Sequence, residues 1–361
     1  MKVLVFPEDG NPYQALLYGA MPKSINISYI KAPKHNPLEI LFYTPVSLFF
    51  LLKNRPSSRL LHIHWMYPFS LPPKVPFSKR IAYFNSCIFL YSAKLLGYKI
   101  VWTVHNVLPH ASLTSNDLKV RRQLSRISIA KIVHSKSSIL EMKRLGINTE
   151  NCQIIPHGNY KAVYQNNISK AGARQSLHIP LQAKVVVFFG RIETYKNIPE
   201  LLAAYQEIAK EIQDVYLIVA GECPDLKLRQ LLENASAASK GRLLFEGHFI
   251  DNNDIQIFFN AADICVFPFK EITTSGSVLL AATFGKPVVV PYLGALKDIP
   301  QEVGYFYDPS KKDALKNSIS ALLHDTRRRK EMAAASLRYT KTLSWDKIAK
   351  QTLKVYQSIT D

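Results

Sequence analysis

The chain has 361 residues, of which 47% are hydrophobic and 20% charged, so it is long enough for two globular domains with a core each. Its four cysteines show no paired spacing, which argues against a disulfide framework or a zinc motif and is typical of a reduced cytoplasmic protein. The longest apolar run, Ile40 to Leu52, contains Pro45 and is too short to span a bilayer, and a strand is expected from the second residue onward, so we expect no signal peptide.

The net charge of +19 is concentrated in the first half of the chain. Residues 1–180 contain 23 Lys and Arg against 6 Asp and Glu, a net +17, whereas residues 181–361 contain 23 against 21, a net +2. A basic half of this kind indicates contact with nucleic acid, with an anionic membrane surface or with an anionic substrate.

Strand and helix patterns alternate along the chain, which predicts an α/β protein with parallel sheets covered by helices on both faces. In the first half we expect strands at 2–6, near 60–64 and at 100–104, 130–134 and 153–155, with helices at 80–96, 117–127 and 136–144. In the second half we expect strands at 184–189, 215–220, 243–246, 264–267 and 288–291, with helices at 198–212, 226–239, 254–260, 277–284 and 345–358. The polar segment 159–176 is the favoured domain boundary.

Two acidic residues, Glu8 and Asp9, follow the first strand and precede Gly10-Asn11-Pro12. They are candidates for a carboxylate base or for binding substrate hydroxyls; a solvated turn is the alternative. His62 and His64 alternate in the next expected strand, so both imidazoles face one side, and Trp65 follows. No third ligand is evident, so acceptor contact or packing is favoured over metal binding.

The segment 74–99 combines cations with apolar side chains. Its expected helix, 80–96, is cationic at both ends and aromatic and apolar in the middle. This composition suits insertion at a lipid interface, where each Lys or Arg near anionic lipid contributes about 1 kcal/mol. A helix buried in the core explains the apolar middle equally well.

Two segments of the second half predict anion-binding sites. Gly190 allows a tight turn after the strand at 184–189, Arg191 and Lys196 add two cations, and Asn197 can cap the following helix. Together a strand end, a helix start and two cations suit a diphosphate, although a βα loop with solvated charges is the alternative. Farther along, Thr273-Thr274-Ser275-Gly276-Ser277 stands where a helix begins, so its N–H and O–H donors can converge on phosphate oxygens, or it is a simple Ser/Thr cap.

These segments resemble the GT-B glycosyltransferases, specifically the nucleotide-sugar-dependent family 4 (group 1). The resemblance rests on the Gly190-Arg191 pair with Lys196, on Ile155-Pro156-His157-Gly158, on Gly285-Lys286-Pro287-Val288-Val289 and on Ser344-Trp345-Asp346. It is strong from about Val101 onward and weakest over the first hundred residues. It implies GT-B architecture: two Rossmann-like domains whose parallel sheets face a central cleft. The implied domains are an acceptor-binding domain 1–165, a nucleotide-sugar-binding domain 166–344, and a helix 345–361 that packs back on the first.

The resemblance also implies site residues. Arg191 and Lys196 would stabilise the leaving diphosphate without a metal or other cofactor, and Glu271 would contact the donor sugar. His105, in Trp102-Thr103-Val104-His105, would lie near the donor's anomeric carbon and pyrophosphate. The expected catalytic residues are thus His105, Arg191, Lys196 and Glu271. The expected donor-binding residues are Gly190, Arg191, Lys196, Glu271, Thr273, Thr274, Ser275, Gly276 and Ser277. The expected acceptor-binding residues are Glu8, Asp9, Asn11, His64 and Trp65.

One position departs from the family pattern. The family's second Glu, associated with ribose, falls at Leu280, which cannot hydrogen-bond a ribose. Ribose must therefore be held by another residue, and retention of configuration does not follow from the motif.

The expected function is transfer of a hexosyl group from a nucleoside-diphosphate sugar to a lipid-linked saccharide in polysaccharide or glycolipid biosynthesis. The partners would be the nucleotide sugar, the lipid-linked acceptor and the anionic inner face of the membrane, on which a cytoplasmic enzyme would lie peripherally. Two alternatives remain: a nucleotide-sugar epimerase of the same fold, and a non-enzymatic nucleic-acid-binding protein. The latter is favoured by charge alone and leaves both anion sites unexplained, so we expect no nucleic-acid partner.

Overall fold

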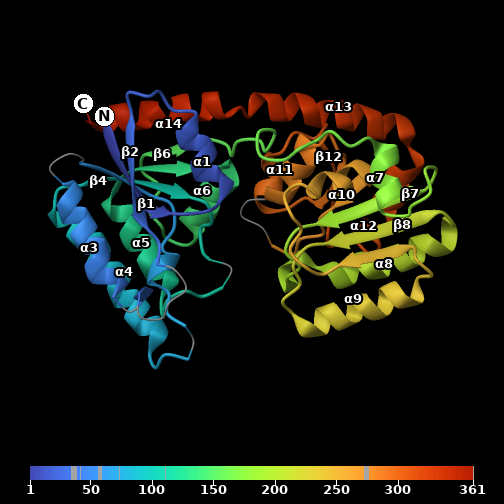
Figure 1. Ribbon diagram of the computed structural model, residues 1–361, viewed down its shortest axis with the longest axis horizontal. Coiled ribbons are helices and arrows are strands. Elements are labelled where there is room, and N and C mark those ends of the chain that lie inside the picture. Colours follow the sequence, from blue (N-terminus) through green and yellow to red (C-terminus); the bar gives the residue numbers. More distant parts are fainter. Residues whose placement is uncertain are drawn as a thin grey trace. The chain divides into compact units, whose positions relative to one another are not determined.

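The computed structural model describes residues 1–33, 39–40, 42–55, 59–72, 74–109, 111–271 and 276–360. The chain forms two compact units (Figure 1): unit 1 is Met1–Gly158 with Trp345–Asp361, and unit 2 is Asn159–Ser344. Residues 159–165 therefore belong with unit 2, whereas the sequence placed the boundary after residue 165.

Unit 1 contains a six-stranded parallel sheet in the order β2-β1-β3-β4-β5-β6. Its strands are β1 (Lys2–Glu8), β2 (Asn26–Lys31), β3 (Leu60–Ile63), β4 (Lys99–Val104), β5 (Ser128–Val133) and β6 (Cys152–Ile154). Its helices are α1 (Pro12–Gly19), α3 (Tyr43–Asn54), α4 (Ser78–Leu95), α5 (Asp117–Ile127), α6 (Lys136–Arg144) and α14 (Trp345–Thr360), with a 3-10 turn η1 (Tyr67–Phe69).

Alternation along the strands divides the core of unit 1 into two layers. Leu4 and Phe6 of β1 join one hydrophobic cluster with α3, α4 and α5, whereas Val3 and Val5 join another with α1 and α14. Successive side chains of a strand point to opposite faces, so a strand buried on both faces needs an unbroken apolar run, and β1 supplies one.

Unit 2 contains a second six-stranded parallel sheet, in the order β12-β11-β10-β7-β8-β9. Its strands are β7 (Lys184–Phe189), β8 (Val215–Ala220), β9 (Leu243–Glu246), β10 (Ile264–Val266), β11 (Val288–Pro291) and β12 (Gly304–Tyr307). Its helices are α7 (Lys170–Ser176), α8 (Ile198–Glu211), α9 (Leu226–Ala238), α10 (Ile255–Ala261), α11 (Gly276–Thr283), α12 (Ala314–His324) and α13 (Thr326–Thr342), with 3-10 turns η2 (Thr194–Lys196) and η3 (Gly294–Asp298).

The expected α/β fold with two parallel sheets is confirmed. The sequence analysis did not identify seven elements: α1, β2, α3, α7, β12, α12 and α13. Helix α7 is an example, because it lies in the polar segment that we expected to be a linker. Its Arg174 is only 1% exposed and donates hydrogen bonds to the carbonyls of Ala261 and Ala183 and to the carboxylate of Asp263. A buried arginine with hydrogen-bond partners thus anchors α7 where most helices use apolar residues. The apolar repeat from which a helix is predicted is therefore missing from its sequence.

Helix α1 owes its position to its first residues. Asn11 caps the helix, because its side-chain oxygen accepts a hydrogen bond from the N–H of Tyr13, and Pro12 occupies the first turn, where its missing N–H costs nothing. The helix then buries Tyr13 and Leu17 beneath the sheet. This cap places the Tyr13 ring at the carboxyl ends of the strands.

Candidate functional site

In unit 2 the two predicted anion-binding segments lie against each other. Gly190 follows β7 with φ of +133°, and a Cβ atom added there would stand 2.8 Å from Oγ of Ser277, at the start of α11. A Cβ at Gly221, after β8, would stand 2.3 Å from the carbonyl oxygen of Gly190. Only glycine fits these positions, since both the backbone conformation and the space exclude a side chain.

Lys196 is held in a desolvated position on η2. It is 9% exposed, and its Nζ lies 4.8 Å from the ring centroid of Tyr195 and 4.5 Å from that of Phe269. Burial lowers the pKa of Lys196 to about 8, while nearby Glu193 acts in the opposite direction. A hydrogen bond of 3.0 Å from the N–H of Lys270 to the carbonyl of Tyr195 ties the two loops together. An ammonium group whose hydration is already lost binds an anion strongly.

Arg191 is in a different environment. Its side chain is 57% exposed, and Nε lies 3.3 Å from a carboxylate oxygen of Glu193 and 3.8 Å from one of Glu222. A diphosphate would have to compete with these two carboxylates for the guanidinium group. A ligand could thus bind Arg191 by displacing these carboxylates, whereas burial fixes the position of the Lys196 side chain.

Asn197 does not cap α8 as the sequence predicted. Its backbone is in the left-handed region, with φ of 58°, and it makes no side-chain cap hydrogen bond. Its side-chain amide instead donates to the carboxylate of Glu200. The tight passage from η2 into α8 fixes this conformation and with it the direction of the preceding Lys196.

The remaining donor-binding candidates divide into three groups. Glu271 is exposed, and Gly276 and Ser277 begin α11, where a Cβ at Gly276 would lie 3.1 Å from the hydroxyl oxygen of Tyr160. Thr273, Thr274 and Ser275 lie outside the described residues. Leu280, at the position of the family's second Glu, packs into the core of unit 2.

In unit 1 a cluster of imidazoles gathers where three neighbouring strands end. His62 lies in β3 and His64 directly follows it, His105 follows β4 and His134 follows β5. Nδ1 of His64 lies 3.1 Å from Nε2 of His105, and Nδ1 of His105 lies 3.4 Å from Nε2 of His134. The expectation that the rings of His62 and His64 share one face is confirmed, with centroids 4.1 Å apart.

Aromatic rings enclose His105. Trp65 stacks on its ring at 4.3 Å with an interplanar angle of 12°, and Tyr13 meets it edge-on at 4.7 Å. The ring of Tyr13 also lies 5.1 Å from that of His157 and 5.2 Å from that of Trp345. These contacts hold the imidazole in a rigid, largely apolar setting.

Burial keeps the imidazoles neutral. It lowers the pKa of His134 to about 4 and the pKa values of His62 and His157 to about 3. It also holds the pKa values of His64 and His105 well below the ordinary value, and the neighbouring imidazoles lower them further. Near neutral pH each ring is therefore neutral and carries one N–H.

The acceptor-binding candidates differ in burial and in hydrogen bonding. Both ring nitrogens of His64 are hydrogen-bonded within the protein, to Tyr18 and His105, and the residue is 1% exposed, which corresponds to the packing alternative. Asp9 accepts hydrogen bonds from the hydroxyl of Tyr67 at 2.5 Å and the N–H of Asn11 at 2.6 Å, so its carboxylate is oriented, whereas Glu8 is exposed.

The sequence analysis missed several residues of the cluster. His134 follows an apolar strand just as His105 does, so the same strand-end rule could have found it. Tyr13, Tyr18 and Tyr356 lie on helices, and only the fold shows that they reach the imidazoles.

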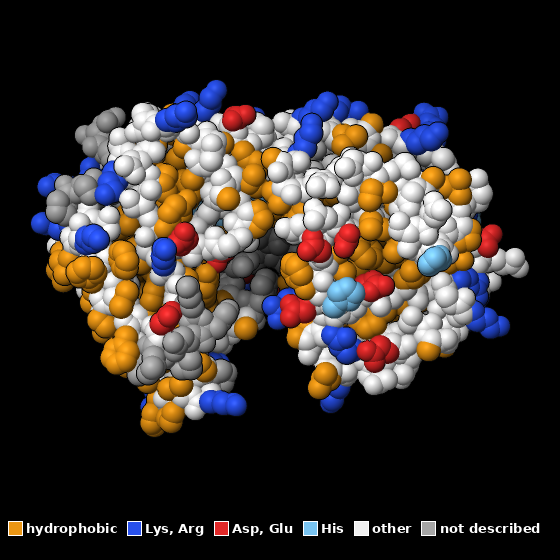
Figure 2. Space-filling model, viewed as in Figure 1, with side chains coloured by type: hydrophobic (Ala, Val, Ile, Leu, Met, Phe, Trp, Pro, Cys, Tyr) orange, Lys and Arg blue, Asp and Glu red, His pale blue; other side chains and the backbone are white. Residues whose placement is uncertain are grey.

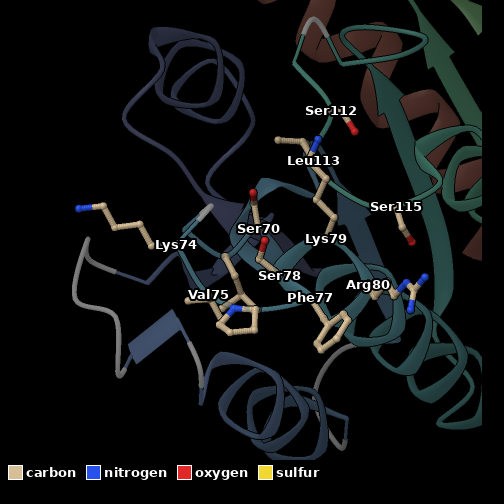
Figure 3. Close-up of a pocket in the computed structure, with 12 residues that line it drawn as sticks. Ser70, Lys74, Val75, Phe77, Ser78, Lys79, Arg80, Ser112, Leu113 and Ser115 are labelled. Carbon is tan, nitrogen blue, oxygen red and sulfur yellow. The ribbon is translucent and has the colours of Figure 1, made fainter.

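A second feature of unit 1 is a pocket of about 610 Å³ at the start of α4 (Figure 3). The figure shows the hydroxyls of Ser70 and Ser78 near its centre and Lys79 extending toward Leu113, while Lys74 points outward. The lining residues are Ser70, Leu71, Lys74, Val75, Pro76, Phe77, Ser78, Lys79, Arg80, Ser112, Leu113 and Ser115. Among the described residues, no carboxylate forms an ion pair with Lys74, Lys79 or Arg80.

Within the described part of the chain, no group of three or more His, Cys, Asp or Glu residues is arranged to hold a metal ion. The imidazole cluster is no exception: its nitrogens are hydrogen-bonded to one another or to hydroxyl and carbonyl groups.

Comparisons with known proteins agree with this geometry. The family model described as glycosyl transferases group 1 matches residues 183–325, which lie within unit 2. The GDP-mannose:glycolipid 4-beta-D-mannosyltransferase of Xanthomonas campestris is 24% identical over 299 residues, or 81% of this chain and 73% of that protein. Two solved structures cover 99% of this chain: sucrose-phosphate synthase from Thermosynechococcus elongatus (98% of that chain, TM-score 0.78, 17% identity) and HepE of Anabaena in complex with UDP (100% of that chain, TM-score 0.75, 18% identity).

The fold and these similarities define a nucleotide-sugar-dependent glycosyltransferase with GT-B architecture. Residues 183–325 match the group 1 glycosyltransferases, and the resemblance suggested by the motifs is thereby supported.

The desolvated ammonium group of Lys196 makes a prediction about nucleotide binding. Because its pKa is about 8, the ammonium loses its proton above that pH, and the affinity for UDP or GDP should fall by up to about tenfold per pH unit there. Calorimetric titration at about pH 7 and pH 9 measures this change. Lys196→Ala should bind weakly at both pH values, and Lys210→Ala, an exposed lysine on α8, should behave as the wild type. A wild-type affinity independent of pH would show that the ammonium does not contact the nucleotide.

The neutral imidazoles make unit 1 sensitive to acid. In the unfolded chain each His takes up a proton below about pH 6.5, whereas in the folded unit His62, His134 and His157 do so only near pH 3 to 4. The free energy of unfolding is therefore unaffected by these histidines above about pH 6.5. Below that pH it falls by about 1.4 kcal/mol per pH unit for each residue, until the folded protein takes up the same protons.

All three tryptophans, Trp65, Trp102 and Trp345, lie in unit 1, so their fluorescence during urea unfolding reports this unit alone. We expect the free energy of unfolding to fall steeply between about pH 7 and pH 5. His134→Asn, which keeps a donor for the carbonyl of Ile155 but cannot be protonated, should reduce that slope by about one proton. Equal stability at the two pH values would contradict the neutral state of the cluster.

Proposed function

We propose that the protein transfers a hexosyl group from a nucleoside-diphosphate hexose to a lipid-linked saccharide, working as a peripheral enzyme on an anionic membrane surface. The observation that carries the lipid part of the proposal is an exposed apolar stripe on unit 1. The similarity to a glycolipid mannosyltransferase supports the same substrate class and makes GDP-mannose the first donor to test.

The apolar stripe runs along one side of α4 and continues on α3, which packs beside it. On α4 it consists of Phe84 (62% exposed), Ile88, Tyr91 and Leu95 (86%), whose spacing puts them on one face of a helix. On α3 it consists of Val46, Phe49 and Leu52. Figure 2 shows hydrophobic side chains gathered over these helices, with Lys and Arg beside them.

Helix α4 combines the two alternatives that the sequence left open. Its other face, with Phe89 and Leu90, is buried in the core, so the helix is anchored while Phe84, Ile88 and Leu95 remain exposed. An apolar patch of this size with a cationic border suits a surface that dips into the headgroup region. No helix in the described ranges is long and apolar enough to cross a membrane.

The pocket at the start of α4 supports the proposal, because its lining could bind the phosphate of a lipid-linked acceptor. Lys79 and the hydroxyls of Ser70 and Ser78 supply a cation and two donors, and exposed Phe77 at its edge continues the apolar surface. A polyisoprenoid diphosphate needs an anion site beside an apolar surface, and this region of unit 1 provides the two together.

In the proposed reaction Lys196 and Arg191 neutralise the charge that develops on the departing diphosphate, which is the main electrostatic requirement of the step. Glu271 and the donors of residues 273–277 would hold the sugar and phosphates, as the resemblance implies. Glu8 or Asp9 would bind the acceptor hydroxyl or take its proton, and His105 would face the donor. No metal is needed for these roles.

The transfer itself can be tested with GDP-mannose, UDP-glucose and UDP-galactose, each incubated with a prenyl-diphosphate oligosaccharide. We expect NMR to show a glycosylated product with one donor. Lys196→Ala should lower kcat about a hundredfold, because losing one such donor costs about 3 kcal/mol in the transition state. Lys210→Ala is the control. Release of free nucleotide and a changed sugar without acceptor would indicate a nucleotide-sugar epimerase instead. Binding to nucleic acid that survives Lys196→Ala would favour a non-enzymatic nucleic-acid-binding protein.

Membrane contact can be tested by sedimentation with anionic vesicles. The double variant Phe84→Ser/Leu95→Ser should weaken vesicle binding at least about tenfold, since each side chain loses a large apolar area. The matched control is Phe249→Ser/Leu226→Ser, which removes residues of the same types that are 74% and 78% exposed on unit 2. Equal losses in the two variants, or none in either, would contradict a role for the stripe.

A further inference from the structure

The imidazole cluster of unit 1 forms a hydrogen-bonded chain with one direction. It begins at the carbonyl oxygen of Ile155, 2.9 Å from Nδ1 of His134. A carbonyl oxygen can only accept, so Nδ1 of His134 carries the proton and its Nε2 is bare. Bare Nε2 of His134 can only accept in turn, so the facing Nδ1 of His105 carries the proton.

The same reasoning continues inward. With its proton on Nδ1, neutral His105 has a bare Nε2, which accepts from Nδ1–H of His64 at 3.1 Å. His64 is then bare at Nε2 and accepts the hydroxyl proton of Tyr18 at 2.8 Å. One backbone carbonyl therefore determines the tautomers of three imidazoles, provided that each ring is neutral.

The inner end of this chain is closed. The Tyr18 hydroxyl lies 2.9 Å from Nδ1 of His62, which also lies 2.5 Å from the Tyr356 hydroxyl, and Nε2 of His62 lies 2.7 Å from Oγ1 of Thr103. His62, Thr103 and Tyr356 are 0% exposed. A relay must deliver protons to solvent or substrate at both ends, so this arrangement is suited to orienting His105 and not to conducting protons from it.

The chain also opposes protonation of His105. A proton added at its Nε2 would face the N–H of His64, so His64 and Tyr18 would both have to exchange their donor and acceptor roles. The ionisable groups that lower the pKa of His105 beside burial are His134, His157, His62 and Arg121, whose positive forms would repel the new charge. The Tyr13 hydroxyl on α1 has no positive form and acts only through its ring, which meets His105 edge-on. A diphosphate nearby would otherwise favour the imidazolium.

We propose that His64 and His134 are positioning residues that hold His105 as the neutral Nδ1–H tautomer during sugar transfer, with the carbonyl of Ile155 fixing the direction of the chain and the Tyr18 hydroxyl favouring the same direction at the inner end. This inference rests on the proposed function only for its kinetic consequence, because the tautomer can be observed in the protein without any substrate.

The tautomer is tested by nitrogen-15 NMR of protein labelled at histidine, with signals assigned through single His variants. In the wild type we expect protonated Nδ1 and bare Nε2 for His105, His64 and His134 alike. Tyr18→Phe, which removes the hydroxyl donor, should weaken the preference of His64 for the Nδ1–H tautomer, while His134 keeps its proton on Nδ1 because the carbonyl of Ile155 still accepts from it. Tyr356→Phe, which removes an equivalent hydroxyl at the inner end, should leave the His105 pattern unchanged. A proton on Nε2 of His105 in the wild type would overturn the proposal.

The kinetic arm separates orientation from simple packing. His64→Phe keeps an aromatic ring without a donor and should lower kcat by about 10- to 100-fold, as the loss of an orienting partner of an imidazole does, with little change in KM. It should also move the acid limb of the kcat profile upward toward about pH 6.5. His64→Asn, whose amide N–H replaces Nδ1–H, should restore most of the rate and the original limb.

Equal rates and equal acid limbs in the two His64 variants would overturn the positioning role even if the tautomers are as expected. If no donor and acceptor pair gives transfer, the function proposed above fails while the NMR result still stands. Folding of each variant is checked by tryptophan fluorescence, and Tyr18→Phe serves as the second variant where His64→Phe does not fold.

Discussion

Parallel strands end at one edge of their sheet, and the functional chemistry of this protein depends on that constraint. In unit 1 the ends of β3, β4 and β5 deliver histidines that lie far apart in sequence to one cluster. In unit 2 the ends of β7 and β10 deliver Gly190, Lys196 and the start of α11 to one place. In such sheets the loops after the strands carry the ligand site, so the sheets decide where chemistry can occur before any side chain is chosen.

Desolvation governs both groups of residues, with opposite consequences. Lys196 lies against two aromatic rings, and its burial lowers its pKa yet leaves a cation with little hydration to lose on meeting a diphosphate. The imidazoles of unit 1 are buried together, and burial is the largest cause that lowers their pKa values, so they stay neutral. A neutral imidazole has a direction, with one donor and one acceptor, and a chain of them carries orientation over several residues.

The cations of the two units have different surroundings, which bears on the excess of positive charge in the first half of the chain. The ion pairs described above lie in unit 2, where acidic and basic residues are nearly balanced, and many of its cations are used internally, such as Arg174 with Asp263. In unit 1 Lys79 and Arg80 border a pocket beside an exposed apolar stripe. Across the residues that the structure describes, these cations form no ion pair with a carboxylate, and cations beside exposed aromatic side chains are the combination on which the proposed lipid contact rests.

The sequence by itself determined the alternation of strands and helices, the fold class and the family, because buried parallel strands need apolar runs and phosphate-binding turns need glycine and cations at set spacings. It also located Gly190, Arg191, Lys196 and His105. Helix α7 escaped it because a buried polar residue, Arg174, holds it in place, whereas α12 has a regular apolar repeat (Leu315, Ile319 and Leu322) that could have been found.

Only the tertiary structure decided how those residues are used. It buried Lys196 and left Arg191 paired with two glutamates, it moved Asn197 from a cap to a left-handed turn, and it placed Leu280 in the core. It also joined Tyr18 of α1 and Tyr356 of α14 to His62, although more than 300 residues separate the two tyrosines. Such contacts depend on which helix faces which side of a sheet, and that is set by the packing of the whole unit and not by any local pattern.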